Sequence, residues 1–240
     1  MSHPSASHPI VSQEEWLTAR KALLAKEKEE GRLRDEVNAA RMAMPWVKVE
    51  KDYVFDTPSG KKSLAELFDG RDQLVVYHFM LGPDWTEGCL RCSFLCDHIG
   101  DSLPHLNNHG VTWTAVSRAP LAGIETYKSR MGWKFPWASS FGSDFNHDFN
   151  VSFTEEERAS GAIHYNYADR KMNRDELSGL SSFVRGEQGE VFHAYSTYAR
   201  GLEALAGTLL MLDRTALGRR ETSSLSFVKR RDEYREERLA

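Results

Sequence analysis

The three cysteines are the residues of this chain with the clearest capacity for chemistry, and all of them lie between positions 89 and 96. Cys89 and Cys92 form a Cys-x-x-Cys motif, whose two thiols can alternate between dithiol and disulfide. Haem attachment is excluded because Ser93, and not a histidine, follows the second cysteine. An odd cysteine count of 3 in 240 residues also excludes a secreted disulfide scaffold. We therefore expect redox or metal chemistry at this motif.

The position of the motif in the predicted secondary structure supports redox chemistry. Residues 73–80 form a continuous apolar run typical of a buried parallel strand, residues 81–88 form a loop, and a helix begins at Cys89. Free N–H groups at a helix start lower the pKa of a thiol there. We expect Cys89 to be the nucleophile and Cys92, one turn later, to resolve the mixed disulfide. Arg91 either adds positive potential or points into solvent.

Cys96 follows Cys92 by four positions, so both can lie on one helical face. One interpretation is a small buried hydrophobic residue. The other is a third metal ligand, with the fourth supplied by His98 or by His105 and His109. We expect no resident cofactor, and a metal site at Cys96 and His98 remains the secondary hypothesis.

The pattern of the chain predicts alternating strands and helices. Pro104 should kink or end the helix that contains the cysteines, and Gly186 to Gly189 is a strong hairpin signal. The expected elements are 53–55, 64–68, 73–80, 89–108, 111–116, 121–131, 181–185, 190–195 and 198–213. From residue 73 onward their order, β-α-β-α-β-β-α, predicts an α/β thioredoxin-like fold, in which helices flank a mixed central sheet.

We expect three parts along the chain: 1–45, a disordered start and helical arm; 46–215, the thioredoxin-like domain with an insert at about 141–179; and 216–240, a charged tail. Ser12 and Glu15 have capping-box spacing at the start of the arm helix, and Pro45 closes it. The arm either grips a partner subunit, giving a possible homodimer, or packs on its own domain. For residues 219–240 we expect a frayed helix.

Composition narrows the location and the partners. A formal charge of −4 and a pI of about 6.2 argue against a nucleic-acid binder. No apolar run approaches the roughly 20 residues of a membrane span. The first ten residues lack the charged and apolar regions of a secretory signal. We therefore expect a cytoplasmic protein with no nucleic-acid or membrane partner.

From residue 11 to about 213 the sequence resembles a bacterial thioredoxin-like family of unknown function, described as predicted dithiol-disulfide oxidoreductases. The stretches that carry this resemblance are 81–93, 116–121 (Val-Ser-Arg-Ala-Pro-Leu), 130–140 (Arg-Met-Gly-Trp-Lys-Phe-Pro-Trp-Ala-Ser-Ser), 144–150 and 179–201. The resemblance implies a thioredoxin-like fold and a redox role, and it does not specify a substrate.

A looser similarity to peroxiredoxins adds accessory residues in the loop before Cys89. Residues 53–80 resemble the first hairpin and core strand of that family, and Pro83, Thr86 and Cys89 resemble its Pro, Thr and Cys pattern, with one residue fewer between Pro83 and Thr86. The similarity implies an arginine aimed at peroxide, for which Arg118 and Arg200 are candidates; either could instead be a surface salt-bridge partner. Asp84 and Trp85 lie within the same loop.

Other candidate residues have two interpretations each. Trp85, Trp133 and Trp137 could wall a substrate groove or pack in the core. His78 could be a satisfied core histidine or a proton relay to the dithiol. All 8 prolines lie at or before Pro136, so the cis-proline that thioredoxins place before the strand facing the active site is missing. We expect Leu180, Ser181 or Ser182 to occupy that position.

The leading hypothesis is a thiol-disulfide oxidoreductase that acts on a protein or small-molecule disulfide and is restored by an external thiol reductant. The alternatives are a non-enzymatic metal- or ligand-binding module on the same scaffold and a peroxiredoxin-like thiol peroxidase.

Overall fold

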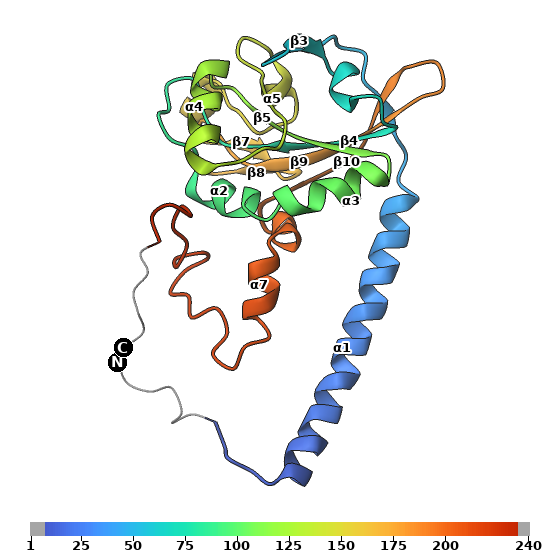
Figure 1. Ribbon diagram of the computed structural model, residues 1–240, viewed down its shortest axis with the longest axis vertical. Coiled ribbons are helices and arrows are strands. Elements are labelled where there is room, and N and C mark those ends of the chain that lie inside the picture. Colours follow the sequence, from blue (N-terminus) through green and yellow to red (C-terminus); the bar gives the residue numbers. More distant parts are fainter. Residues whose placement is uncertain (1–7, 235–240) are drawn as a thin grey trace. The chain divides into compact units, whose positions relative to one another are not determined.

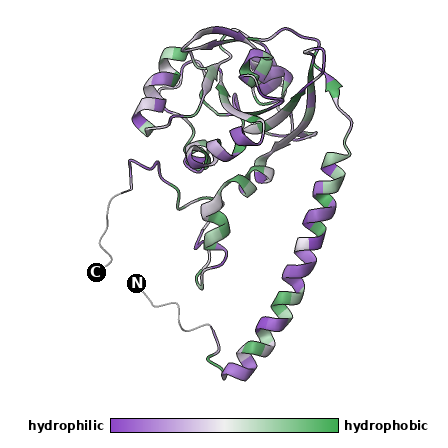
Figure 2. Ribbon diagram, turned by 45° about the vertical axis from the view of Figure 1, so that its right-hand side comes forward, coloured by the Kyte–Doolittle hydropathy of each residue, from purple (hydrophilic) through white to green (hydrophobic). Residues whose placement is uncertain are grey.

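The computed structural model describes residues 8–234, and the chain divides into two compact units, Met1–Pro45 and Trp46–Ala240. The first unit contains one long helix, α1 (Gln13–Met42). The hydroxyl of Ser12 accepts from the Glu15 N–H, and the Glu15 carboxylate bonds back to Ser12, so the predicted capping box is present. No residue of α1 is buried, and Figure 2 shows its apolar residues interspersed with polar ones.

The second unit is built on one mixed sheet of eight strands in the order β1-β10-β9-β4-β5-β6-β2-β3. β4 runs parallel to β5, and β5 runs parallel to β6, whereas β9 is antiparallel to both β4 and β10. The strands are β1 (Val47–Lys48), β2 (Val54–Thr57), β3 (Gly60–Ser63), β4 (Gln73–His78), β5 (Val111–Ser117), β6 (Trp137–Ser139), β9 (Gly179–Arg185) and β10 (Val191–Tyr198).

This topology is thioredoxin-like, which confirms the predicted fold class. The core strands β4 and β5 hold the expected apolar, β-branched runs, and most of their side chains are buried. The predicted turn at Gly186 to Gly189 joins β9 to β10, where Gly189 has the positive φ of 90° that a glycine accepts without strain.

Helices cover both faces of the sheet (Figure 1). On one face, Tyr77 and Trp113 share an apolar cluster with residues of α2 (Leu90–Cys96) and α4 (Leu121–Met131). On the other face, Leu74 and Val76 pack with η2 (Glu66–Phe68), α5 (Phe145–Asp148) and the segment that follows. The dithiol motif therefore belongs to the α2 face.

The two longest helices expected in this unit are each divided. The first becomes α2, η3 (Gly100–Ser102) and α3 (Leu103–Asn108), with Pro104 in the first turn of α3, where its missing N–H costs nothing. The second becomes η4 (Ala199–Leu205) and α7 (Gly207–Leu212). Ala206 between them, with φ −99° and ψ 85°, cannot continue a helix.

The insert 141–179 is an excursion on the face opposite α2. Besides α5 it contains α6 (Glu155–Ala159), which begins with a second capping box from Thr154 to Glu157, and a small hairpin of β7 (Ile163–Tyr165) and β8 (Ala168–Arg170). Phe145 and Val151 are fully buried, so the excursion completes the core on that side of the sheet.

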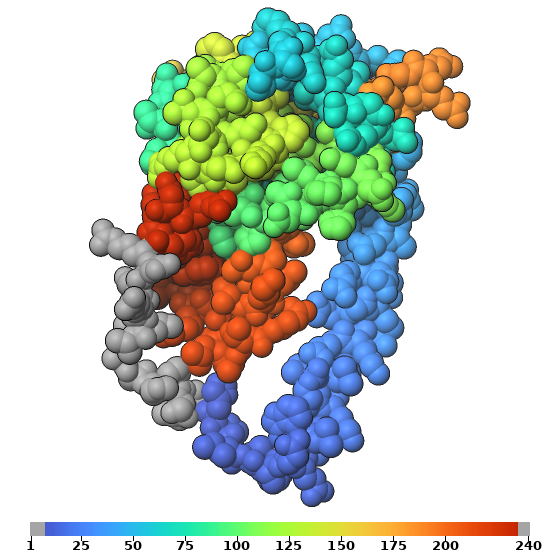
Figure 3. All heavy atoms as spheres, in the orientation of Figure 1, coloured from blue at the N-terminus to red at the C-terminus, as the bar shows by residue number. Residues whose placement is uncertain are grey.

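The C-terminal segment, residues 219–234, differs from its prediction. Its described residues form turns and bends and no helix, and they pack on the domain. Val228 is buried, and the ring of Phe227 makes an edge-to-face contact with the ring of Phe94 in α2. Figure 3 shows this segment in red against the green atoms of the domain. Among the described residues, no helix has the length and apolar character needed to cross a membrane.

Candidate functional site

Cys89 is fixed at the junction between the loop after β4 and the start of α2, where it is the N-cap residue. Its N–H donates to the Met80 carbonyl at 3.0 Å, and its own carbonyl accepts from the N–H and the hydroxyl of Ser93, both at 2.9 Å. The backbone on both sides of the thiol is therefore held by hydrogen bonds. This is the strand-to-helix position that the sequence predicted.

The two thiols of the motif have opposite electrostatic environments. Cys89 is partly exposed, whereas Cys92 is buried, 1% exposed. The hydrogen bond from the Cys92 thiol, together with N–H groups of Cys92 and Arg91 and the Arg91 charge, lowers the pKa of Cys89 to about 6 against the effect of burial. Burial, followed by the bond to Cys89, raises the pKa of Cys92 well above its ordinary value. Cys89 is therefore a thiolate at neutral pH and Cys92 a thiol.

Tyr77 is a site residue that sequence reasoning missed. It lies in β4, 1% exposed, and its hydroxyl is hydrogen bonded to the Cys92 sulfur, which partly offsets the effect of burial on the pKa of that thiol. Burial raises the pKa of Tyr77 itself well above its ordinary value, so the hydroxyl keeps its proton. Its position two residues before Phe79, on the face toward the motif, was the available signal.

Cys96 is buried in the core, and both ring nitrogens of His98 are hydrogen bonded within the protein. Cys96 is 1% exposed, and burial raises its pKa well above the ordinary value. Nδ1 of His98 is 2.8 Å from the Phe94 carbonyl and must donate to it, so Nε2 accepts from the N–H of Thr208 at 3.2 Å. Within residues 8–234 no three His, Cys, Asp or Glu side chains gather as a metal group.

A cavity of about 590 Å³ opens beside the dithiol. Cys89, Cys92 and Tyr77 contribute to one wall, and the others come from Tyr165, the segment before β9, η4, α7 and the C-terminal segment. Leu177 and Ser178, directly before β9, border the cavity, whereas Leu180, Ser181 and Ser182 lie within β9 and do not line it. The described part of the chain contains no cis peptide bond.

The loop residues 83–86 do not reach this cavity. Thr86 and Asp84 are exposed, Pro83 is half-buried, and Trp85 donates from Nε1 to Asp175 at 3.3 Å. The Trp85 ring also lies against Gly82, where an added Cβ would come within 3.0 Å of it. Trp133 and Trp137 are buried in the α2-face cluster, so they pack in the core.

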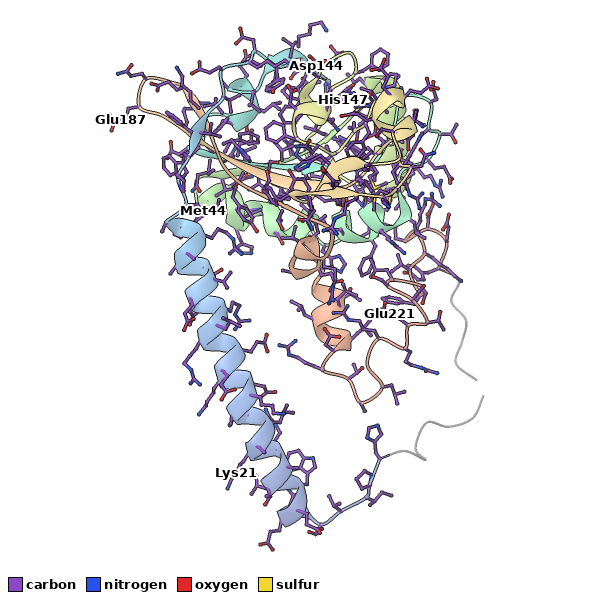
Figure 4. The ribbon with its side chains drawn as sticks, turned by 180° about the vertical axis from the view of Figure 1, so that it is seen from behind. Lys21, Met44, Asp144, His147, Glu187 and Glu221 are labelled. Atoms are coloured by element: carbon purple, nitrogen blue, oxygen red, sulfur yellow. The ribbon has the colours of Figure 1, made fainter. Side chains whose placement is uncertain are left out.

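Arg118 is bonded on the other face of the sheet. Its Nε donates to Glu176 at 2.8 Å and its Nη1 donates to Nε2 of His147 at 2.6 Å. Figure 4 labels His147 on α5, across the sheet from α2. Glu176 is 1% exposed and also accepts from Ser152 at 2.7 Å. Arg118 therefore compensates a buried carboxylate, whereas Arg200 lines the cavity and pairs with Glu203 at 3.3 Å.

His78 belongs to a buried polar chain on the α5 face. Its Nε2 is hydrogen bonded to Ser181 at 2.8 Å, Ser181 to Ser196 at 2.7 Å, and Ser196 to Nε2 of His193 at 2.7 Å. Burial lowers the pKa of His78 to about 3, and its ring stacks on Phe145 and Phe149. His78 is therefore a core histidine placed away from the dithiol, but it is not fully satisfied, because its buried Nδ1 has no hydrogen-bond partner among the described residues.

The C-terminal segment holds the entrance to the site. Arg230 donates to the carbonyl of Gly88, next to Cys89, at 3.1 Å, and to the Tyr127 hydroxyl at 3.0 Å. It also pairs with Glu87 at 3.0 Å. Tyr127 in turn is hydrogen bonded to Ser93 at 2.8 Å. These contacts have little signal in the sequence, because the segment is rich in charges of both signs.

The fold and the site define a thioredoxin-fold protein with two neighbouring cysteines at the start of the helix that follows its central strand. The chain belongs to the bacterial family of unknown function DUF899, which it matches over residues 5–234. This confirms the family resemblance inferred from the sequence motifs.

Several solved structures of peroxiredoxins are similar to this chain. A peroxiredoxin Q of Xanthomonas campestris is 14% identical, with 66% of this chain and 90% of that chain covered and a TM-score of 0.42. The peroxidoxin BcpB of Mycobacterium tuberculosis is 12% identical, with 69% and 92% covered and a TM-score of 0.46. A PrxQ of Xylella fastidiosa is 14% identical, with 69% and 94% covered and a TM-score of 0.42. No curated protein matches the chain.

Proposed function

We propose that this protein is a thiol-disulfide oxidoreductase in which Cys89 attacks and Cys92 resolves. The observation that carries the proposal is the asymmetry of the pair: a partly exposed Cys89 with a pKa of about 6 lines a cavity, and a buried Cys92 thiol is hydrogen bonded to it. With that pKa, about nine-tenths of Cys89 is thiolate at pH 7. An attacking thiol reacts fastest when its pKa lies near the ambient pH, so a pKa of about 6 suits thiol-disulfide exchange at neutral pH.

The reaction has two exchange steps. The Cys89 thiolate attacks one sulfur of the substrate disulfide, a mixed disulfide forms, and the other substrate sulfur leaves as a thiolate. Cys92 then loses its proton and attacks the Cys89 sulfur, which releases the second substrate thiol and leaves a Cys89–Cys92 disulfide. The Tyr77 hydroxyl supports this step because its hydrogen bond favours the thiolate form of Cys92. An external thiol reductant then restores the dithiol.

The placement of the accessory residues supports disulfide exchange over peroxide reduction. A peroxidase needs a threonine and an arginine aimed at the peroxide beside its thiolate. Thr86 is exposed outside the cavity, and Arg118 is bonded to Glu176 and His147 on the opposite face. Arg200, the other candidate arginine, does line the cavity, but it is paired with Glu203 at 3.3 Å. We therefore place Cys89 and Cys92 in the catalytic roles and give Pro83, Asp84, Trp85, Thr86 and Arg118 no part in the chemistry.

Turnover with a disulfide substrate tests this proposal. We expect the reduced protein to reduce insulin or a small disulfide in the presence of dithiothreitol, Cys89→Ser to abolish this activity, and Cys92→Ser to accumulate a mixed disulfide at Cys89 detectable by mass spectrometry. Cys96→Ala is the matched control and should retain turnover, because Cys96 lies outside the cavity wall. Activity that survives Cys89→Ser, or wild-type protein that reduces no disulfide, would overturn the proposal.

A further inference from the structure

The cavity beside Cys89 has walls suited to an apolar ligand. The apolar side chains that line it include Leu90, Leu95, Leu177, Leu202, Leu209 and Leu225. Its volume, about 590 Å³, lies within the range of sites that enclose a small molecule, roughly 300 to 1,000 Å³. These walls favour a compact substrate with an apolar or aromatic body over an extended protein segment.

The charged residues of the cavity are mostly positive. Arg91, Arg174 and Arg200 line it and are exposed, whereas Glu203 is the carboxylate among the described lining residues. Arg91 donates to the Ser224 carbonyl at 3.0 Å, and Arg200 pairs with Glu203. Arg174 forms no ion pair with any carboxylate of residues 8–234. The opening therefore has surplus positive charge, which attracts anions.

We infer that the substrate is a small disulfide with an apolar or aromatic body and a carboxylate group, an inference that rests on the proposed function. The apolar body would occupy the leucine-lined wall, and the carboxylate would lie near Arg174 and Arg200. The Cys89 thiolate breaks the substrate S–S bond and one half leaves as a thiolate; the other half stays bound to Cys89 as a mixed disulfide and leaves when Cys92 attacks and the Cys89–Cys92 disulfide forms. The two electrons come from the dithiol, so no other reductant enters this half-reaction.

Stopped-flow oxidation of the reduced protein by paired aromatic disulfides tests the substrate class. The probes are 5,5′-dithiobis(2-nitrobenzoate), which carries two carboxylates, and 2,2′-dithiodipyridine, which is neutral. We expect Arg174→Gln with Arg200→Gln to slow the anionic probe about tenfold, which corresponds to about 1.4 kcal/mol, and to leave the neutral probe within about twofold. Lys61→Gln, on exposed β3 away from the cavity, should change neither rate.

The outcomes separate this inference from the proposed function. If both probes oxidise the dithiol but the arginine variant slows them equally or not at all, the substrate class is wrong and the oxidoreductase stands. If neither probe yields a Cys89–Cys92 disulfide, the proposed function itself fails.

A second inference concerns α1 and rests on different observations. Residues at alternating steps of three and four form one seam along this helix: Trp16, Ala19, Leu23, Lys26, Glu30, Leu33, Val37 and Ala40. This is the a and d spacing of a coiled coil. The four large apolar residues of the seam, Trp16, Leu23, Leu33 and Val37, are each at least 46% exposed.

The charges beside the seam select a parallel pairing. Glu15, Glu29 and Glu36 occupy three of the four g positions, and arginines at positions 20, 34 and 41 occupy the e positions five residues later; the fourth such pair of positions holds Ala22 and Glu27. In a parallel, in-register pair each glutamate faces the arginine of the other helix. An antiparallel pair would instead place Glu29 against its own copy. Arg20 also has an ion pair with Glu27 in its own helix at 2.8 Å.

We propose that α1 pairs with α1 of a second copy of this chain as a parallel coiled coil. An isolated helix gains little stability from propensity alone and needs a partner for its apolar seam. In this parallel pair Lys26 faces Lys26 and Glu30 faces Glu30, so like charges lower the stability of the centre of the seam, and the glutamate–arginine contacts beside the seam must offset this cost. The occupant of the seam is thus the identical helix.

Light scattering of the full chain across a concentration series tests the pairing. We expect the wild-type protein to be a dimer and Leu23→Glu to be a monomer, because this change puts a charge in the seam. Leu24→Glu is the matched control: the adjacent leucine, 40% exposed, lies off the seam, and its variant should stay dimeric. A monomeric wild-type protein, or a Leu23→Glu dimer, would overturn the proposal.

Oxidative crosslinking tests the orientation. In a parallel pair Leu33→Cys faces its own copy, so a disulfide between two identical peptides should appear after proteolysis and mass spectrometry. In an antiparallel pair residue 33 faces residue 23 of the other helix, and this product would be missing.

Discussion

At the scale of single residues, the site depends on two identical side chains made unequal by their surroundings. Cys89 and Cys92 lie three positions apart, yet their pKa values move in opposite directions because one thiol donates to the other and is fully buried. The same hydrogen bond thus stabilises the thiolate form of Cys89 and favours the protonated form of Cys92.

The first prediction concerns that hydrogen bond. Cys92→Ala removes the donor, so the pKa of Cys89 should rise from about 6 toward its ordinary value. Cys92→Ser should give a smaller rise, since a hydroxyl can still donate. The measurement is ultraviolet absorbance of the thiolate against pH, with Cys96→Ala as the control that keeps the midpoint near 6. An unchanged midpoint in Cys92→Ala would assign the low pKa to the backbone N–H groups of α2 instead.

The second prediction separates stability from chemistry at Arg118. Arg118→Met leaves the buried Glu176 carboxylate without its cation, which should cost about 3 to 5 kcal/mol in the free energy of unfolding. Glu176→Gln should cost less, because the amide needs no counter-charge. Urea denaturation measures both, and the rate at which iodoacetamide alkylates Cys89 should stay near wild type. If Arg118→Met stays as stable as wild type but its Cys89 is alkylated more slowly, Arg118 acts in the chemistry of the site and the prediction is wrong.

At the scale of elements, α2 supplies the thiols and the C-terminal segment determines access to them. Ser224 and Leu225 line the cavity, and Arg230 bonds to the carbonyl directly before Cys89. Arg130 of α4 pairs with Glu87 and with Asp232 at 2.7 Å, which ties the segment, the loop and α4 together. A segment held by side-chain contacts at a site is able to open locally.

The third prediction follows from the contacts of Arg230. Arg230→Gln removes its ion pair with Glu87 and weakens its bond to Gly88, so the C-terminal segment should open more often. Alkylation of Cys89 by a bulky maleimide should then accelerate severalfold relative to alkylation by iodoacetamide. Arg231→Gln is the matched control, because Arg231 is 57% exposed and its ion pair with Asp97 spans 3.9 Å. An unchanged ratio of the two rates in Arg230→Gln would show that this segment does not limit access.

At the scale of the whole molecule, the dithiol and the buried polar groups lie on opposite faces of the sheet. The α2 face contains the dithiol, and the α5 face contains the buried chain from His78 to His193 and the Arg118–Glu176 pair. Phe145 and Val151 of the insert 141–179 complete the core of the second face, whereas other residues of the same insert line the cavity beside the dithiol: Tyr165, Arg174, Leu177 and Ser178. Separation of the two faces lets the stability of the domain respond to pH through groups that do not touch the thiols.

The fourth prediction is a loss of stability in mild acid. The pKa of His78 is about 3 in the folded chain and 6.5 ordinarily. Between about pH 6.5 and pH 3 this histidine is therefore protonated in the unfolded chain and neutral in the folded chain. Stability from this residue is fully present above pH 6.5 and should fall by about 2 kcal/mol between pH 7 and pH 5. His193, whose pKa burial also lowers, acts in the same direction.

Urea unfolding at pH 7 and pH 5 measures this effect. His78→Gln can keep a hydrogen bond to Ser181 and cannot titrate, so the pH dependence should be smaller by that amount. His164→Gln, an exposed histidine on β7, should keep the wild-type dependence. If the free energy of unfolding falls equally in wild-type protein and in His78→Gln between pH 7 and pH 5, the prediction is wrong.

Features that depend on near neighbours in sequence were determined by the sequence itself. The capping box of Ser12 and Glu15, the end of α4 at Gly132, the turn before β10 and the junction at Cys89 each need only residues a few positions apart. Apolar periodicity then gave the order of strands and helices, and with it the thioredoxin-like topology. Cys89 as the proposed nucleophile is also a prediction made at this level, because a helix start acts on the residue that occupies it.

Tertiary structure alone decided which distant groups meet. Arg230 bonds to Gly88 across 142 positions, and Arg118 bonds to Glu176 across 58. Exposed and paired arginines look the same in a sequence, because burial and partners depend on how the sheet and its excursion pack. The hydrogen bond between Tyr77 and Cys92 and the leucine-lined cavity arise in the same way. The sequence therefore determined where the thiols lie, and only packing decided what surrounds them.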